Sequence, residues 1–259
     1  MATAYGEHSS QIVHRRDPEV SSGPAPVAVL LHGGWWRDLH DARLMDPLAR
    51  DLAAAGWAVW NVEYRRTGAD GGGWPQSVDD VARALDLLAE TAEREEGLDL
   101  SRVVAVGHSA GGHLALLTAA ASPVASVVAL APITDLRRCA EAGLGEGAVE
   151  PFLGADPSPE EYAESSPLHR LPLGIPQLIV HGDADQRVPV EHSRDYVDAA
   201  RLAGDPVDYR EIPGEDHFAV VDPTSVAWRT VREVLGPVGA ADAKGRAIPP
   251  DRPAPIGAR

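Results

Sequence analysis

The sequence is short of several features, and each shortage excludes a class of protein. It holds one cysteine, Cys139, so no intrachain disulfide can form and a disulfide-stabilised secreted framework is excluded. No apolar run approaches the ~20 residues that a membrane-spanning helix needs. The first 19 residues lack the apolar core of a signal peptide. We therefore expect a cytoplasmic protein with no membrane partner.

Basic residues and bulky apolar residues are also scarce. The 259 residues include 39 acidic and 23 basic side chains, which gives a formal net charge of −16. Nucleic acids and anionic membrane surfaces would repel such a chain, so neither is expected as a partner. With only two Phe and two Met, the core has to be built from Ala, Val and Leu. The length fits one large α/β domain as well as two small ones.

Short apolar runs alternate with amphipathic segments along the chain. This alternation predicts βαβ units, hence an α/β fold with a mostly parallel sheet and helices on both faces. Ser77 is the expected N-cap of the longest helix. We expect strands at residues 27–31, 57–62, 103–106, 127–130, 178–180 and 207–212, and helices at residues 41–55, 77–95, 110–121, 190–203 and 225–235.

Two segments interrupt this alternation. Residues 136–173 lack a clear strand, and we interpret them as a short lid insertion over the site. Residues 237–259 are rich in Ala, Gly and Pro without apolar periodicity, so we expect a disordered C-terminal tail. Residues 1–236 then form a single domain. In parallel sheets ligands bind beyond the carboxyl ends of the strands, so the chemistry is expected in the loops that follow them.

A G-x-S-x-G motif follows the strand at 103–106 and leads directly into a helix. Its residues are Gly107, His108, Ser109, Ala110 and Gly111. The motif has meaning in this strand-to-helix context, because a tight turn with small neighbours exposes the serine hydroxyl at the positive end of a helix. We expect Ser109 to be a nucleophile. The alternative is a tight turn with a capping serine.

A serine hydroxyl needs a base, and the base needs an acid to orient it. His217 is the best candidate base, because it lies between the last expected strand and the last helix. Asp185, after the strand at 178–180, is the favoured acid, with Asp183 and Asp135 as alternatives. The chain order Ser, Asp, His is the one expected on this kind of sheet.

Residues 32–36, His-Gly-Gly-Trp-Trp, follow the first core strand and predict an oxyanion hole. We expect its donors to be the backbone N–H groups of Gly34 and Trp35, joined by that of Ala110. A glycine turn with two packed tryptophans is the alternative. Candidate substrate-binding residues are Trp36, Trp74 and His108. The chain lacks the paired spacing of zinc motifs such as H-E-x-x-H, so no metal is expected.

Five stretches together resemble the α/β-hydrolase superfamily: HGGWW, NVEYRR, WPQSVDDV, GHSAGGHLALL and HGDADQRVP…DHF. They look most like small esterases and the kynurenine-formamidase-like (arylformamidase) branch, over roughly residues 25–235. The resemblance implies an α/β-hydrolase fold, no metal or organic cofactor, and Ser109, Asp185 and His217 in the triad positions. Formamidase-type members often carry HGGYW where this chain has HGGWW, so the pocket wall differs.

These features predict a serine hydrolase (EC 3.1.1 or 3.5.1) that cleaves a small carboxylic ester or activated amide through an acyl-enzyme. Three alternatives are kept: an arylformamidase, a biosynthetic acyl-transfer, cyclisation or lyase enzyme on the same fold, and a non-catalytic ligand-binding protein. The expected partner is a small-molecule ester or amide. A homodimer is left open.

Overall fold

The structure is a computed structural model that describes residues 1–20, 23–120, 123–236 and 238. The predicted disordered tail therefore lies, apart from Val238, outside the described residues. No helix in the described part of the chain is both long enough and apolar enough to cross a membrane.

One eight-stranded sheet runs through the molecule in the order β1-β2-β4-β3-β5-β6-β7-β8. β1 and β2 are antiparallel additions at one edge, and β3 to β8 are mutually parallel. The mostly parallel sheet expected from the sequence is thus confirmed. The strands are β1 Ala2–Ala4, β2 Ile12–Arg16, β3 Ala25–Leu31, β4 Ala58–Glu63, β5 Leu98–His108, β6 Ser126–Leu130, β7 Gln177–Gly182 and β8 Val207–Ile212.

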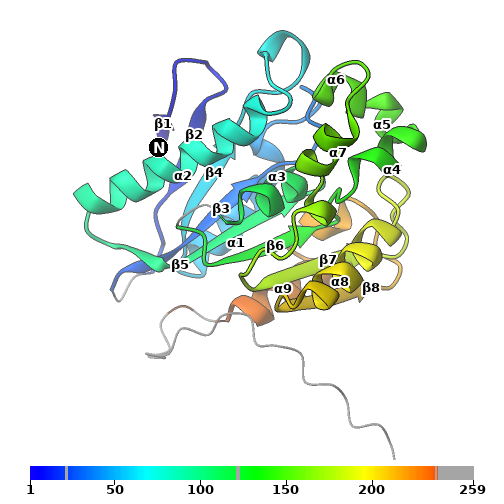
Figure 1. Cartoon of the computed structure of the whole chain (residues 1–259). Coiled ribbons are helices and arrows are strands. Elements are labelled where there is room, and N and C mark those ends of the chain that lie inside the picture. Colours follow the sequence, from blue (N-terminus) through cyan, green and yellow to red (C-terminus); the bar gives the residue numbers. More distant parts are fainter. Residues whose placement is uncertain (21–22, 121–122, 237, 239–259) are drawn as a thin grey trace, which may run out of the picture.

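Helices cover both faces of the sheet (Figure 1), as alternating strands and helices require. On one face pack α2 (Gln76–Arg94), α3 (Ala110–Thr118) and α8 (Glu191–Ala203), and on the other α1 (Asp46–Ala54) and α9 (Val226–Leu235). Each face has its own apolar core, and both cores are dominated by Val, Leu and Ala. The six residues of β4 and all seven of β3 are buried, which is typical of strands covered on both sides.

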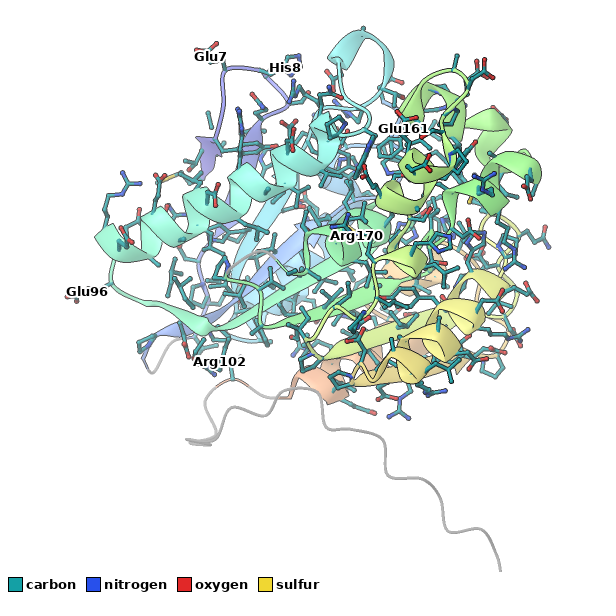
Figure 2. The ribbon with its side chains drawn as sticks, in the orientation of Figure 1. Glu7, His8, Glu96, Arg102, Glu161 and Arg170 are labelled. Carbon is teal, nitrogen blue, oxygen red and sulfur yellow. The ribbon has the colours of Figure 1, made fainter. Side chains whose placement is uncertain are left out.

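The segment between β6 and β7 contains four short helices and no strand. Figure 2 labels Glu161 in this segment, on the side of the molecule away from Glu96 and Arg102, which lie near the start of β5. The segment therefore stands at the carboxyl edge of the sheet, where the site is expected. Its helices are α4 Leu136–Glu141, α5 Leu144–Gly147, α6 Val149–Leu153 and α7 Pro159–Ser165, followed by the 3₁₀ turn Pro167–His169.

The structure corrects one local prediction and adds two strands. Ser77 is not the N-cap of α2; Pro75 precedes the helix, and Ser77 lies buried in its first turn. Its hydroxyl donates to the carbonyl of Arg65 at 2.6 Å, so it ties the helix to the preceding loop. The strands β1 and β2 were not predicted, because their short mixed sequence carries little apolar pattern.

Candidate active site

Ser109 occupies a sharp turn between β5 and α3. Its backbone has φ 55° and ψ −118°, a conformation that costs a non-glycine residue on the order of 1–3 kcal/mol. Two hydrogen bonds hold it there: Ser109 N–H donates to the carbonyl of Leu130 at 2.8 Å, and Ser109 O accepts from His113 N–H at 3.0 Å. The serine therefore stands at the amino end of α3, at the carboxyl edge of the sheet.

The two glycines of the motif are required by close backbone approach. A Cβ on Gly107 would collide with the carbonyl oxygen of Gly111, and a Cβ on Gly111 would collide with that of Leu31. The turn is thus packed against the end of β3 with no room for a methyl group. This packing brings Ser109 beside the loop that follows β3.

His217 and Asp185 meet through a short hydrogen bond. His217 Nδ1 lies 2.6 Å from Asp185 Oδ2, and both side chains are almost fully buried. A donating Nδ1–H leaves Nε2 as the proton acceptor, which is the tautomer a general base needs. The other two candidate acids are engaged elsewhere: Asp183 accepts from Gly214 N–H, and Asp135 caps α4.

Asp185 is held ionised by its surroundings. Burial by itself raises the pKa of this carboxyl group, but hydrogen bonds from His181 and His217 outweigh burial and hold the pKa well below its usual range. The other carboxylate oxygen accepts from the N–H groups of Arg187 and Val188 at 2.7 and 2.9 Å. A fixed carboxylate of this kind can orient an imidazole and stabilise its cation.

His108 holds the base close to the sharp turn at residues 107–111 that carries Ser109, the elbow. Its Nε2–H donates to the backbone carbonyl of His217 at 2.9 Å, and the two rings lie 4.7 Å apart. His108 is the residue immediately before Ser109. The structure therefore places His217, with Asp185 bound to it, against the residue next to Ser109. Within the described residues no hydrogen bond joins the Ser109 hydroxyl to the His217 ring, so their pairing stays a prediction.

The loop after β3 turns three successive residues into positive φ: Gly34 at 124°, Trp35 at 55° and Trp36 at 57°. The loop touches the elbow, because a Cβ on Gly33 would lie 3.0 Å from Ser109 Cβ. Within the described residues, no acceptor takes the backbone N–H groups of Gly34, Trp35 or Ala110. Unpaired N–H groups beside a nucleophile are what an oxyanion hole requires.

A buried network that the sequence did not reveal supports this loop. His32 Nε2 lies 3.0 Å from Glu63 Oε1 at the end of β4, and Glu63 Oε2 accepts from Ala42 N–H at 2.8 Å. Tyr64 stacks on the His32 ring at 4.4 Å and donates to its carbonyl. The motif NVEYRR carries Glu63 and Tyr64, yet nothing in its spacing says which strand end they face.

The predicted substrate-binding residues occupy different environments. Trp36 is completely buried, stacks on Phe152 at 4.2 Å and donates to His113 Nδ1. His108 is buried as well, whereas Trp74 is partly exposed and packs at the edge of the core. These positions give Trp36 a packing role, and they give His108 a contact with the loop after β8 that carries His217, the base loop. Their contact with a substrate stays a prediction.

The segment between β6 and β7 touches the same loop. A Cβ on Gly145 would collide with the Trp35 ring, so α5 lies directly on that side chain. Arg37 donates to the carbonyl of Glu146 at 3.1 Å. His113 Nε2 donates to the carbonyl of Ser165 at 2.7 Å. Burial lowers the pKa of His113 to about 4, so the ring is neutral at pH 7.

The described residues contain no group of three or more His, Cys, Asp or Glu side chains arranged to hold a metal ion. The arrangement that is present consists of a strained serine, an oriented imidazole, an ionised carboxylate and unpaired amide donors. Such a set can add a hydroxyl to an acyl carbon and stabilise the resulting oxyanion.

The sequence matches the BD-FAE family model over residues 16–199, which is well over half of the chain. The chain belongs to the BD-FAE family. The α/β-hydrolase fold expected from the sequence is thereby confirmed, as is the resemblance to esterases and kynurenine formamidases.

Three relatives illustrate what this BD-FAE chain is similar to. It is 28% identical to esterase LipC of Mycobacterium tuberculosis, over 84% of this chain and 59% of LipC. It is 24% identical to kynurenine formamidase of Drosophila melanogaster, over 86% of this chain and 75% of that protein. The solved structure of a bacterial heroin esterase superposes with a TM-score of 0.72 at 27% identity, covering 86% of this chain and 77% of the esterase. The chain spans little more than half the length of LipC.

Proposed function

We propose that this protein is a carboxylesterase-like serine hydrolase that cleaves a small carboxylic ester through an acyl-enzyme. Ser109 attacks the acyl carbon while Nε2 of His217 takes the hydroxyl proton. The carbonyl oxygen becomes an oxyanion that accepts from the N–H groups of Gly34, Trp35 and Ala110. The same imidazole then protonates the leaving alcohol, and water repeats the sequence to release the acid.

The observation that carries this proposal is the 2.6 Å contact between His217 Nδ1 and Asp185, next to a serine at φ 55°. A non-glycine residue keeps such a backbone where the surrounding structure enforces it, and this happens mostly at functional sites. A ligand-binding protein would have no use for an ionised carboxylate that orients a buried imidazole beside a strained hydroxyl. Esterases among the relatives support the same reaction class.

The test combines a fluorophosphonate probe with a short-chain p-nitrophenyl ester. We expect the probe to label Ser109 in the folded wild-type protein and the ester to be hydrolysed. Ser109→Ala should abolish both, and Cys139→Ser should abolish neither, because the Cys139 thiol is buried against His192. A folded wild-type protein that is neither labelled nor active would favour the non-catalytic binding alternative.

An arylformamidase is the second candidate function. The kynurenine formamidase of Drosophila melanogaster matches this chain over a larger share of its own length than LipC does. A formyl group is the smallest acyl group, so it would use the same nucleophile and oxyanion donors. Comparing kcat/KM for N-formylkynurenine with that for a phenyl acetate separates the two. A product other than the free acid would point to the biosynthetic alternative.

The helices α4 to α7 fit a lid over this site, because α5 rests on Trp35 beside the oxyanion donors. Ser109 and His217 are 1% and 5% exposed, so most of the surface of both residues is covered. Trp74 and Trp36 remain candidate walls of the pocket. A cytoplasmic location and the formation of a homodimer stay predictions.

A further inference from the structure

His108 is a buried ionisable side chain for which the proposed reaction has no direct use. Its ring is 1% exposed and lies between two catalytic loops. On one side a Cβ on Gly33 would lie 2.8 Å from His108 Nδ1, so the ring packs on the loop after β3 that carries the proposed oxyanion donors, the oxyanion loop. On the other side Nε2 contacts the carbonyl of His217.

The hydrogen-bond pattern of His108 fixes its tautomer. A carbonyl oxygen accepts, so the proton must sit on Nε2, and Nδ1 is left as a bare acceptor. Within the described residues Nδ1 is buried and has no hydrogen-bond partner. Burial and the neighbouring His217 keep the pKa of His108 well below its ordinary value, so the ring stays neutral. An unsatisfied buried nitrogen destabilises the fold. Packing alone would be better served by an apolar ring.

The hydrogen bond to His217 has no substitute. Two hydrogen bonds join the loop that carries His217 to the loop after β7. Gly214 N–H donates to the Asp183 carboxylate, and Ala184 N–H donates to the carbonyl of Glu215. Within the described residues, the bond from His108 is the only hydrogen bond that joins this loop to the elbow. Asp185 fixes the far end of the imidazole, so the distance from the imidazole to Ser109 depends on the elbow side.

We propose that His108 is a positioning residue that sets the distance between the imidazole of His217 and the hydroxyl of Ser109 by donating to the carbonyl of His217. This inference rests on the proposed hydrolase function. It assigns His108 a role in the alignment of the base, in place of the substrate contact expected from its position next to the nucleophile. A misplacement of about 1 Å between reacting groups can lower a rate by about 100-fold.

The variants separate donation from packing. His108→Leu removes the donor, and His108→Gln returns an N–H close to the position of Nε2. His108→Asn is polar but too short to reach. His192→Leu is the matched control, because His192 is also buried, and burial lowers its pKa to about 4, so its ring is also neutral at pH 7. Within the described residues its ring nitrogens contact Thr134 and Cys139, which belong to neither catalytic loop.

With p-nitrophenyl acetate, we expect His108→Leu and His108→Asn to lower kcat by ~10- to 100-fold with KM changed by less than about threefold. His108→Gln should recover most of kcat, and His192→Leu should keep kcat within about threefold of wild type. Equal losses in His108→Leu and His192→Leu, or a Gln variant no better than Asn, would overturn the proposal. The Gln and Asn pair keeps the test decisive if His108→Leu does not fold.

A second measurement does not depend on turnover. The proton shared by His217 Nδ1 and Asp185 is observable by ¹H NMR as a far-downfield resonance in the folded protein. We expect this resonance to shift or broaden in His108→Leu and to stay unchanged in His192→Leu. If the wild type hydrolyses no ester but the resonance responds in this way, the proposed function fails while the positioning role stands. If the wild type is active and neither kcat nor the resonance responds, the positioning role fails alone.

Discussion

Two buried histidine–carboxylate pairs flank the elbow, and they serve different ends. On the acid side His181 Nε2 lies 3.1 Å from Asp185 Oδ2, just after β7. On the oxyanion side His32 Nε2 lies 3.0 Å from Glu63 Oε1, between the ends of β3 and β4. Residue types, distances and burial are nearly the same in the two pairs.

The difference lies in the third partner. Asp185 Oδ2 also accepts from His217, so its charge acts on a ring that transfers a proton. The second carboxylate oxygen of Glu63 accepts from Ala42 N–H, and the other ring nitrogen of His32, Nδ1, lies 2.8 Å from the carbonyl oxygen of Gly33. The second pair therefore holds backbone in place and touches no proton-transfer group. A buried ion pair reveals its role through what else each partner contacts.

The strongest test of this contrast replaces the acid. Asp185→Asn should lower kcat by roughly 10⁴-fold, because an amide at this position favours the wrong tautomer of the base. Asp183→Asn is the matched control, since Asp183 lies two residues away, is exposed, and within the described residues accepts only from Gly214 N–H. It should change kcat by less than about threefold. Steady-state kinetics on both variants measures this, and reversed effects would move the acid role to Asp183.

A substitution in the His32–Glu63 pair, on the oxyanion side, should lower kcat less. Glu63→Gln weakens the support of the loop but leaves its N–H groups in place, so we expect kcat to fall by ~10- to 100-fold. This is less than the ~100- to 1,000-fold that the loss of a donor costs. Asp80→Asn is the control, because Asp80 is a buried carboxylate bound to Arg65 and Gln11, away from the loop. If Glu63→Gln lost as much kcat as Asp185→Asn, the two pairs would not differ in role.

A third test uses pH and two histidines that have no carboxylate partner. Burial lowers the pKa of His113 and of His192 to about 4. At pH 7 both rings are neutral in the folded and in the unfolded chain, so folding removes no proton from them. Because their folded pKa lies below the unfolded value of about 6.5, the free energy of unfolding falls as pH drops from about 6.5 toward 4. Each of the two histidines should lower the free energy of unfolding by roughly 2 kcal/mol between pH 7 and pH 5.

Urea unfolding at the two pH values measures this loss. The double variant His113→Gln, His192→Gln should lose less stability on acidification than the wild type, because glutamine does not titrate. Asp185 does not add to the difference, since its depressed pKa keeps it ionised throughout this range. Parallel pH dependence in the two proteins would rule out the neutral buried state of these rings.

The smallest expected effect concerns the contact between α5 and the oxyanion loop. Gly145 and Gly143 have almost the same backbone, φ 59° and 61°, but a methyl group meets the Trp35 ring at Gly145 and nothing within 4 Å at Gly143. Alanine strains both positions by about 1 kcal/mol. We expect Gly145→Ala to lower kcat/KM by about three- to tenfold, and Gly143→Ala by less than twofold. Equal kinetics would show that α5 does not influence the site.

Much of the architecture follows from the sequence, since the apolar runs of β3 and β6 and the amphipathic faces of α2 and α9 are strong local signals. The position of Ser109 followed from its strand-to-helix context, and the structure gives that residue the strained turn that the motif implies. Local patterns identify elements in this way because the side-chain period of an element is local.

The rest depends on contacts between distant segments. No spacing rule shows that Glu63 reaches His32, or that His108 turns toward the carbonyl of His217. The same holds for Trp36, whose neighbours Phe152 and His113 come from other parts of the chain. A sequence pattern names the residue types available for chemistry, and packing decides which of them face the reacting group.

The most direct test of the central claim is to trap the acyl group. Rapid mixing of the protein with p-nitrophenyl acetate, an acid quench and peptide mapping by mass spectrometry identify the residue that is acylated. The account predicts an acetyl group on Ser109, with a nitrophenol burst of about one per protein where deacylation is the slower step. An acetyl group on another residue, with none on Ser109, would contradict it.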